Sequence, residues 1–362
     1  MKKKILFLSI IYFLFHILYL GACTGITIKS KDGSWVYGRT LEFAKDLYSN
    51  LIIVPRGYTY SGTTPEGNNG LQWNVTYAFA GLNGAIIPTL VADGINEKGL
   101  AAGAFYLPGY AVYQQYKKEL SKKTVSPMDV PAWILSNFAT VKEVKENLKT
   151  IRVVPVTIKE WGFVPPLHFI VTDSTGESIV IEYLKGEVVV HQNPIGVITN
   201  APTFDWHLTN LANYINLSPD NASPKKIGRM TIKQLGQGSG MLGLPGDFTP
   251  PSRFIRATAL SQSTAPGETA YKTVQQLFHI LNQFDIPQGT VCNDKGICEK
   301  TQWTSAADLA NKRYYFHTVN NRSIRMVDLN KADLDAKSIV SIPVASVDEK
   351  VEDLTPKAGK LK

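Results

Sequence analysis

The sequence lacks a second long apolar run, a block of basic residues and any internal repeat. Its one apolar run, residues 5–20, is short for a membrane-spanning helix, and no further run of about 20 apolar residues follows it. The formal net charge is +8, but the lysines and arginines are spread along the chain without a block. This pattern gives no reason to expect nucleic-acid binding or stable membrane insertion.

Signatures of metal and nucleotide sites are also missing from the sequence. The glycine-rich stretch at 236–247 does not have the spacing of a phosphate-binding loop that ends in Lys-Ser/Thr. The histidines that follow residue 20 are scattered without the spacing of metal ligands: His168, His191, His207, His279 and His317. We therefore expect no metal and no organic cofactor.

What is present begins with an export signal. Residues 2–4 are lysines, residues 5–20 form an almost unbroken apolar run, and Gly21-Ala22 is a small pair, which is the order of a secretory signal peptide. We interpret residues 1–22 as a signal peptide that is removed, and we expect an exported chain, periplasmic or secreted. Cys23 would then carry a thiol and a free α-amino group, a nucleophile with its own base.

The same residues allow a second interpretation. The run Leu20-Gly21-Ala22-Cys23 also fits the pattern after which bacterial lipoproteins are cleaved and acylated. Lipid on the sulfur would remove the nucleophile, and the chain would be an exported, lipid-anchored binding protein. A lipoprotein normally continues into a flexible polar tether, whereas residues 24–28 have the pattern of a strand, so we favour the nucleophile.

Cys292 and Cys298 bracket a turn-rich loop at 293–297. In an oxidising compartment this spacing favours a local disulfide, and two free thiols are the alternative. Without a nearby histidine cluster the spacing is a poor zinc signature. Cys23 is then unpaired, which in an exported protein indicates a reactive thiol.

The hydrophobic pattern predicts an α+β fold with antiparallel sheets and helical layers. Strands at 24–28 and 35–43, joined by a turn at 31–34, form a hairpin that brings Arg39 and Glu42 beside Cys23. A guanidinium next to a thiol favours the thiolate, so we expect Arg39 to lower the pKa of Cys23. Periodicity further predicts strands at 51–55, 73–80, 89–92, 101–105, 169–171, 178–183, 188–191, 195–198 and 314–319, a turn at 93–100, and helices at 128–148, 208–215, 226–235, 251–260 and 268–284.

Six short blocks that occur in one order resemble the choloylglycine hydrolase and penicillin V acylase family of N-terminal-nucleophile hydrolases. They are Cys23-Thr24-Gly25, Gly38-Arg39-Thr40-Leu41-Glu42, Asp93-Gly94-Ile95-Asn96-Glu97-Lys98-Gly99-Leu100, Thr199-Asn200-Ala201-Pro202-Thr203-Phe204, Gly243-Leu244-Pro245-Gly246-Asp247-Phe248 and Ser252-Arg253-Phe254. The resemblance implies a four-layer αββα fold with two stacked antiparallel sheets, taken as one domain at 23–346 before a polar tail at 347–362. It often implies a homotetramer.

The resemblance also assigns roles. Cys23 would be the nucleophile and its amine the general base, Arg39 a neighbouring cation, Asn200 an oxyanion-hole donor and Arg253 a charge that organises the site. The expected reaction is acyl transfer: Cys23 attacks a linear amide, the amine departs with a proton, and water hydrolyses the thioester.

The substrate would be a small-molecule amide that joins an apolar acyl group to a polar amine, such as penicillin V, a conjugated bile salt or an acyl-homoserine lactone. We expect Phe43, Phe105, Tyr106 and Phe204 to line a pocket for the acyl group.

Two positions depart from the family pattern. Glu42 stands where many relatives have an aspartate, and we expect its carboxylate still to hold the Cys23 amine or Arg39. We interpret the block at 104–108 as one residue longer than in relatives, which leaves Tyr106 or a backbone N–H such as that of Thr24 as the second oxyanion donor. With the signal peptide, these departures resemble the Gram-negative branch of the family. An inactive family member is the third interpretation.

Overall fold

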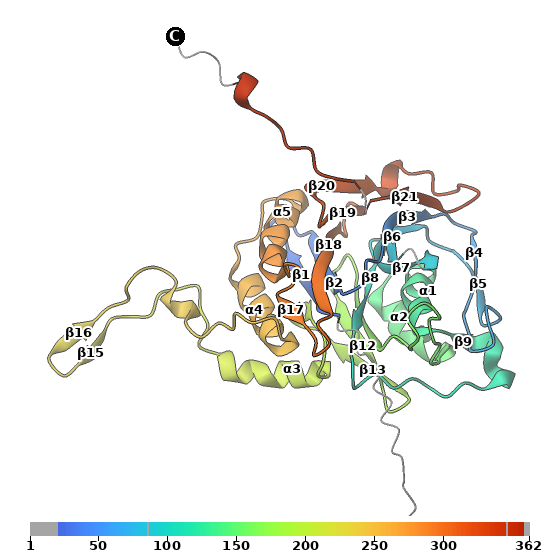
Figure 1. Cartoon of the computed structure of the whole chain (residues 1–362), viewed down its shortest axis with the longest axis horizontal. Helices are drawn as coiled ribbons and strands as arrows, with labels where there is room; N and C mark the ends of the chain where they lie inside the picture. The colour runs from blue at the N-terminus through green and yellow to red at the C-terminus, as the bar shows by residue number, and fades with distance from the viewer. Residues whose placement is uncertain (1–20, 85–86, 345–346, 358–362) are drawn as a thin grey trace, which may run out of the picture.

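Two large antiparallel sheets form the centre of the molecule. The computed structural model describes residues 21–84, 87–344 and 347–357. The first sheet has the strand order β14-β1-β2-β18-β19-β20 with β17 beside β18, and the second has the order β13-β12-β11-β8-β7-β6-β3-β21. Helices cover the outer faces, so the layers follow one another as helix, sheet, sheet, helix (Figure 1). The predicted four-layer fold is confirmed.

The elements have the following bounds. The first sheet contains β1 (Cys23–Lys29), β2 (Trp35–Phe43), β14 (Val197–Ile198), β17 (Val291–Cys292), β18 (Cys298–Asp308), β19 (Arg313–Thr318) and β20 (Asn321–Asp328). The second contains β3 (Asn50–Val54), β6 (Phe79–Gly84), β7 (Ile87–Asn96), β8 (Ala101–Tyr106), β11 (Leu167–Thr172), β12 (Ser178–Leu184), β13 (Glu187–Gln192) and β21 (Val340–Pro343). Short pairs are β4 (Thr59–Ser61) with β5 (Gln72–Asn74), β9 (Thr124–Val125) with β10 (Arg152–Val153), and β15 (Lys225–Ile227) with β16 (Met230–Ile232). The α-helices are α1 (Val130–Asn137), α2 (Val141–Asn147), α3 (Phe204–Asn210), α4 (Pro250–Ser263) and α5 (Ala270–Leu281).

The β1–β2 hairpin is set by a tight polar turn. Gly33 has a φ of 90°, which a residue with a side chain adopts only at a cost, and Asp32 Oδ1 accepts a hydrogen bond from Ser34 N over 2.9 Å. The turn places Gly25 opposite Arg39 and fixes the register of both strands. Because β1 is buried from Cys23 to Ile28, this register cannot slip without moving apolar side chains out of the core.

Helix α5 packs directly on this hairpin. Its buried residues recur at helical spacing and include Val274, Leu277 and Leu281. The close approach depends on Gly38 in β2, since a Cβ there would stand 2.8 Å from Leu277 Cδ2 and 2.6 Å from Ser305 O. Helix α4 lies beside α5 on the same face, and α1 covers β7 and β8 on the opposite side of the molecule.

A buried carboxylate joins the two sheets. Asp93 of β7 is fully buried and accepts hydrogen bonds from Tyr37 of β2 over 2.8 Å, Ser305 of β18 over 2.8 Å and Tyr314 of β19 over 2.7 Å. This corrects the predicted turn at 93–100: Asp93 to Asn96 belong to β7, and the turn begins at Glu97. A polar residue was taken for a turn because its partners lie on another sheet.

Three other predicted elements were wrong in extent or type. The strand at 73–80 is divided between β5 and β6 because Thr76 N and Tyr77 N donate to Ser136 O rather than to a neighbouring strand. The helix at 128–148 breaks into α1 and α2, where Thr140 caps the second helix by accepting from Glu143 N. The predicted helix at 226–235 is instead the exposed β15–β16 hairpin, which extends away from the body (Figure 1).

Candidate active site

Cys23 is the first residue of β1 and is buried at the edge of the space between the sheets. Its backbone nitrogen donates a hydrogen bond to Asn200 Oδ1 over 2.9 Å. The hairpin brings Arg39 and Glu42 next to it, as predicted from the turn, and Glu42 N donates to Ala22 O over 3.1 Å. In the described residues Cys23 is the one cysteine outside a disulfide.

Asn200 and Arg253 connect β1 to two distant parts of the chain. Asn200 follows β14, which pairs with β1, and its Nδ2 donates to Tyr106 O over 2.8 Å. Arg253 of α4 donates through Nη2 to Asn200 Oδ1 over 2.6 Å, and through Nη1 to Cys23 O and to Thr24 Oγ1. These two side chains, which bond to each other, therefore hold the backbone around Cys23, and one of the two N–H groups of Asn200 Nδ2 has its partner in Tyr106 O.

Arg39 lies beneath Cys23 as a fully buried cation. It donates to Ala104 O and to Thr40 O, and its guanidinium lies 4.0 Å from the centroid of the Phe105 ring. Its Nη2 has no hydrogen-bond partner among the described residues. An unpaired N–H on a buried cation can stabilise an anion next to it, such as a thiolate or a developing oxyanion.

The Glu42 carboxylate does not occupy the predicted position. It accepts hydrogen bonds from Thr301 Oγ1 over 2.7 Å and Thr40 Oγ1 over 3.1 Å, and in the described chain none joins it to Arg39 or to the Cys23 nitrogen. Burial raises its pKa to about 8, against the nearby charge of Arg253. Its oxygens contact the hydroxyls of β2 and β18 instead.

The pKa of the Cys23 thiol is raised rather than lowered. Burial is the largest cause and disfavours the thiolate, while Arg39 and Arg253 act in the opposite direction. We expected the nearby cations to lower the pKa of the thiol. This expectation was wrong for the chain with Ala22 attached, because burial has the larger effect. The sequence indicated the charges but could not indicate how deeply the thiol is buried.

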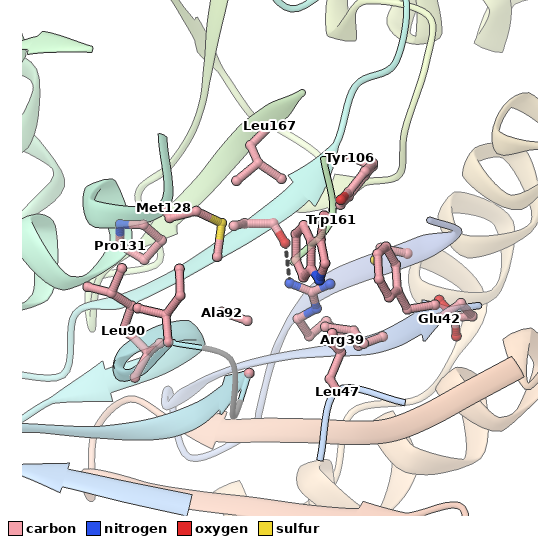
Figure 2. A pocket seen from close by; sticks show the side chains of 17 residues that line it. Arg39, Glu42, Leu47, Leu90, Ala92, Tyr106, Met128, Pro131, Trp161 and Leu167 are labelled. Carbon is pink, nitrogen blue, oxygen red and sulfur yellow. Dashed lines mark hydrogen bonds between the residues drawn. The ribbon is translucent and has the colours of Figure 1, made fainter. Parts of the chain in front are cut away.

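An apolar pocket opens directly over Cys23 and Arg39. Figure 2 shows Arg39 at its centre, with Leu90, Met128 and Pro131 on one side and Glu42 on the other. Other apolar side chains that line it are Leu41, Phe43, Leu47, Val91, Trp161 and Leu167. The pocket places an apolar ligand group within reach of the sulfur and of a buried cation.

Two of the four predicted pocket residues lie in this wall. Phe43 and Tyr106 line the pocket, and their ring centroids are 5.6 Å apart. The other two do not. Phe105 is fully buried under Arg39, because neighbouring residues of β8 point to opposite faces of the sheet. Phe204 packs in the core against Phe254. The pocket residues Trp161 and Met128 were missed because they come from loops and short helices with no pattern that points to a ligand.

Glu299 is a further residue of the site that the sequence did not single out. It lies on β18, is 1% exposed, and its Oε2 accepts a hydrogen bond from Ala22 N over 3.1 Å. Burial raises its pKa to about 7, while Arg253 lowers it. No pattern in the sequence pointed to Glu299, because the strand is interrupted by a bulge between Thr301 and Trp303 and the partner of Glu299, Ala22, lies far away in the chain.

A buried histidine network supports the Asn200 loop from below. His168 contacts Glu182 Oε1 over 3.2 Å and Thr199 O over 3.1 Å, and His207 contacts Asn200 O over 2.9 Å. Potential metal ligands of Glu182, His191 and Asp205 lie within 4.8 Å of one another, but Glu182 already accepts hydrogen bonds from His168 and from the backbone of α3. We assign the network a structural role.

Cys292 and Cys298 are joined by a disulfide, which decides between the two states that the sequence left open. The disulfide pins the start of β18 one residue before Glu299. Among the residues that the structure describes, no helix combines the length and the apolar character needed to span a bilayer.

The fold and the site together define an N-terminal-nucleophile amide hydrolase, with two stacked antiparallel sheets and a cysteine at the start of a central strand. Residues 23–342 match the model of a family described as linear amide C-N hydrolases, choloylglycine hydrolase family. A bile salt hydrolase/transferase from Clostridium perfringens is 37% identical over 88% of this chain and 95% of its own length. The chain belongs to the choloylglycine hydrolase family.

A solved structure confirms this at the level of the fold. The structure of a mutant conjugated bile acid hydrolase from Clostridium perfringens matches with a TM-score of 0.81 and 32% identity, over 92% of this chain and 99% of that one. A penicillin V acylase from Pectobacterium atrosepticum is 29% identical over 82% of this chain and 77% of its own length. The resemblance to the Gram-negative branch stays a prediction.

Proposed function

We propose that the mature chain begins at Cys23, is exported, and hydrolyses a linear amide through a thioester on the Cys23 sulfur. One observation carries the proposal: Cys23 lies where a buried cluster of Arg39, Arg253 and Asn200 meets an apolar pocket. The cluster suits a developing negative charge, and the pocket suits an uncharged acyl group.

The mechanism follows from these contacts. The free amine of Cys23 takes the thiol proton, and the sulfur attacks the amide carbon to give a tetrahedral oxyanion. The free N–H of Asn200 Nδ2 and the Tyr106 hydroxyl, which is buried without a partner among the described residues, are the proposed donors to this oxygen. The ammonium then protonates the leaving nitrogen, the C–N bond breaks, and water hydrolyses the thioester to release the acid and restore the thiol.

The proposed substrate joins an apolar acyl group to a polar amine. The wall formed by Leu41, Phe43, Leu90 and Trp161 offers apolar contact to the acyl group. A conjugated bile salt is the first substrate to test, because the Clostridium bile salt hydrolase shares more identity with this chain than the Pectobacterium penicillin V acylase does. Penicillin V and acyl-homoserine lactones complete the panel.

Intact-mass analysis of the purified protein tests the proposal. Incubation with glycine- and taurine-conjugated bile salts or phenoxymethylpenicillin, followed by an acid quench, should give a chain that starts at Cys23 and carries a transient acyl adduct. The Cys23→Ala variant should bind the same compounds without an adduct. A diacylglyceryl mass on Cys23 would contradict the enzyme and support the lipid-anchored binding protein.

We also propose that the enzyme assembles into a homotetramer through the β15–β16 hairpin. Ile227 is 57% exposed, Met230 68% and Ile232 48%, so apolar side chains gather on a hairpin that has no core of its own. A second copy of the chain is the occupant proposed for this surface. Sedimentation equilibrium should give four times the mass of the chain, and a monomer at micromolar concentration would contradict this assembly.

A further inference from the structure

Glu299 is a buried carboxylate with an incomplete set of partners. Its Oε2 accepts from the backbone nitrogen of Ala22, the residue just before Cys23, while its Oε1 is buried with no hydrogen-bond partner among the described residues. A buried carboxylate oxygen without a donor is costly, so such a group normally has a cation or a further donor close by.

The position of Ala22 fixes how near Glu299 lies to the nucleophile. Two consecutive backbone nitrogens are at most about 3.7 Å apart, and Ala22 N lies 3.1 Å from Glu299 Oε2. Glu299 Oε2 therefore lies within about 7 Å of Cys23 N, with only Ala22 between them. When Ala22 is removed, the carboxylate loses its donor at the moment when Cys23 N becomes an amine.

The other groups around this amine leave room for a second acceptor. An α-ammonium has three N–H donors, and Asn200 Oδ1 accepts one of them over 2.9 Å. The Glu42 carboxylate is held by Thr40 and Thr301 instead. Of the ionisable groups close to Glu299, Arg253 comes from α4 and Tyr106 from the end of β8.

We propose that Glu299 is the positioning residue that holds the α-ammonium of Cys23 in the mature enzyme, one of the two roles expected of Glu42 from the sequence. The inference rests on the proposed function in one respect, that Cys23 is the first residue. Glu299 touches neither the substrate nor the scissile bond. It acts through the amine, by orienting it toward the thiol and by favouring its protonated form until the leaving group takes the proton.

This arrangement has a measurable consequence for proton affinity. An opposite charge within about 4–6 Å commonly shifts a pKa by one unit or more. Replacing Glu299 by glutamine keeps the size and one acceptor oxygen, turns the other oxygen into an NH2 donor, and removes the charge. The pKa of the Cys23 amine should then fall by about one unit, a tenfold loss of proton affinity.

Carbon-13 NMR of labelled cysteine tests the proposal without any substrate. Because Cys292 and Cys298 form a disulfide, Cys23 gives a separate reduced-cysteine signal. Protein whose mass shows Cys23 as the first residue is titrated between pH 5 and 10 as wild type, Glu299→Gln, Glu299→Asp and Asp285→Asn. Asp285 is the matched control, because it is a partly buried carboxylate paired with Arg322 and lies outside the site.

The expected result is an amine titration that moves to lower pH by about one unit in Glu299→Gln, by less in Glu299→Asp, and not in Asp285→Asn. An unchanged titration in Glu299→Gln, or an equal shift in Asp285→Asn, would overturn the proposal. If Glu299→Gln does not fold, Glu299→Asp is the deciding variant. An amine titration unchanged from wild type in Glu299→Asp would then overturn the proposal. A chain that shows the shift but cleaves no amide would refute the proposed function and leave this inference standing.

Discussion

Two hairpins of this chain have similar local geometry and opposite surroundings. The β1–β2 hairpin is buried along almost its whole length and is covered by α5, whereas every residue of β15 and β16 is exposed. The first was predicted from sequence with nearly the observed bounds, and the second was taken for a helix. Strand pairing alone therefore says little about function.

What separates the hairpins is the number of distant segments that depend on them. Through Cys23 and Thr24, β1 contacts Asn200 and Arg253, which lie far along the chain. The hydrogen bonds near β15 and β16 stay within one loop, as between Asn221 and Gly238. A change in the first hairpin should reach catalysis and stability, and a change in the second should reach assembly only.

The largest expected effect is on activity. Asn200→Ala removes the proposed oxyanion donor and the acceptor of the Cys23 nitrogen, so kcat/KM should fall by about 10²–10³-fold. Asn221→Ala, an asparagine beside the exposed hairpin, is the matched control and should leave kcat/KM unchanged. Equal losses of kcat/KM in the two variants would contradict the distinction between the two hairpins. The measurement is steady-state hydrolysis of the substrate that the mass experiment selects.

The next effect is on the pH dependence of stability. Burial raises the pKa of Glu42 from 4.5 to about 8, so the stability linked to its neutral form is present at pH 4 and is lost as the pH rises toward 8. Glu42→Gln should flatten this fall, which amounts to about 1.4 kcal/mol per pH unit at most. Urea unfolding at pH 5 and 8 measures it.

Asp247, next to the exposed loop, supplies a contrast of opposite sign. Hydrogen bonds from Thr249 and Ser252 lower its pKa to about 2, so its contribution is present above pH 4 and is lost as the pH falls. Asp247→Asn should therefore change unfolding at acid pH and not between pH 5 and 8. The same flattening in both variants would contradict the assignment to Glu42.

A smaller effect is expected from packing. Gly38→Ala would push a methyl group into Leu277 and the backbone of Ser305, at a cost of about 1–3 kcal/mol. Gly236→Ala is the control, because a Cβ there meets nothing within 4 Å, and the free energy of unfolding should change by less than about 0.5 kcal/mol. Urea midpoints of the two variants decide the matter.

The smallest effect on stability is expected in the exposed hairpin. Met230→Lys should leave the free energy of unfolding of one chain within about 0.5 kcal/mol of wild type, since its side chain is 68% exposed. The same substitution should dissociate the proposed tetramer in sedimentation experiments. Loss of folding in this variant would show that the hairpin belongs to the core, and an intact tetramer would place the interface elsewhere.

Local sequence predicted what depends on short-range geometry. The turn at Asp32 and Gly33 and the alternation around it gave the β1–β2 hairpin, and with it the approach of Arg39 and Glu42 to Cys23. The helix α5 followed from its apolar stripe. The six short blocks identified the family correctly, because their order along the chain is itself a long-range constraint.

The remainder depended on partners that local sequence does not contain. In the sequence Asp93 resembles a turn residue, because its hydrogen-bond partners Tyr37, Ser305 and Tyr314 lie far from it along the chain. The direction of the Glu42 side chain is decided by Thr301, and Phe105 is removed from the pocket by Arg39 above it. Glu299 could be seen only when β18 placed it beside Ala22.

The peptide bond between Ala22 and Cys23 has a consequence for timing. While Ala22 is attached, the nitrogen of Cys23 is an amide whose lone pair is delocalised, and it cannot accept the thiol proton. Gly21 also lies where a Cβ would stand 3.0 Å from the Tyr106 ring, so the residues just before Cys23 fill space beside this pocket residue. Under the proposed removal of residues 1–22, the precursor would be a zymogen: the site is already folded and in register, and one cut at a single bond would start the chemistry.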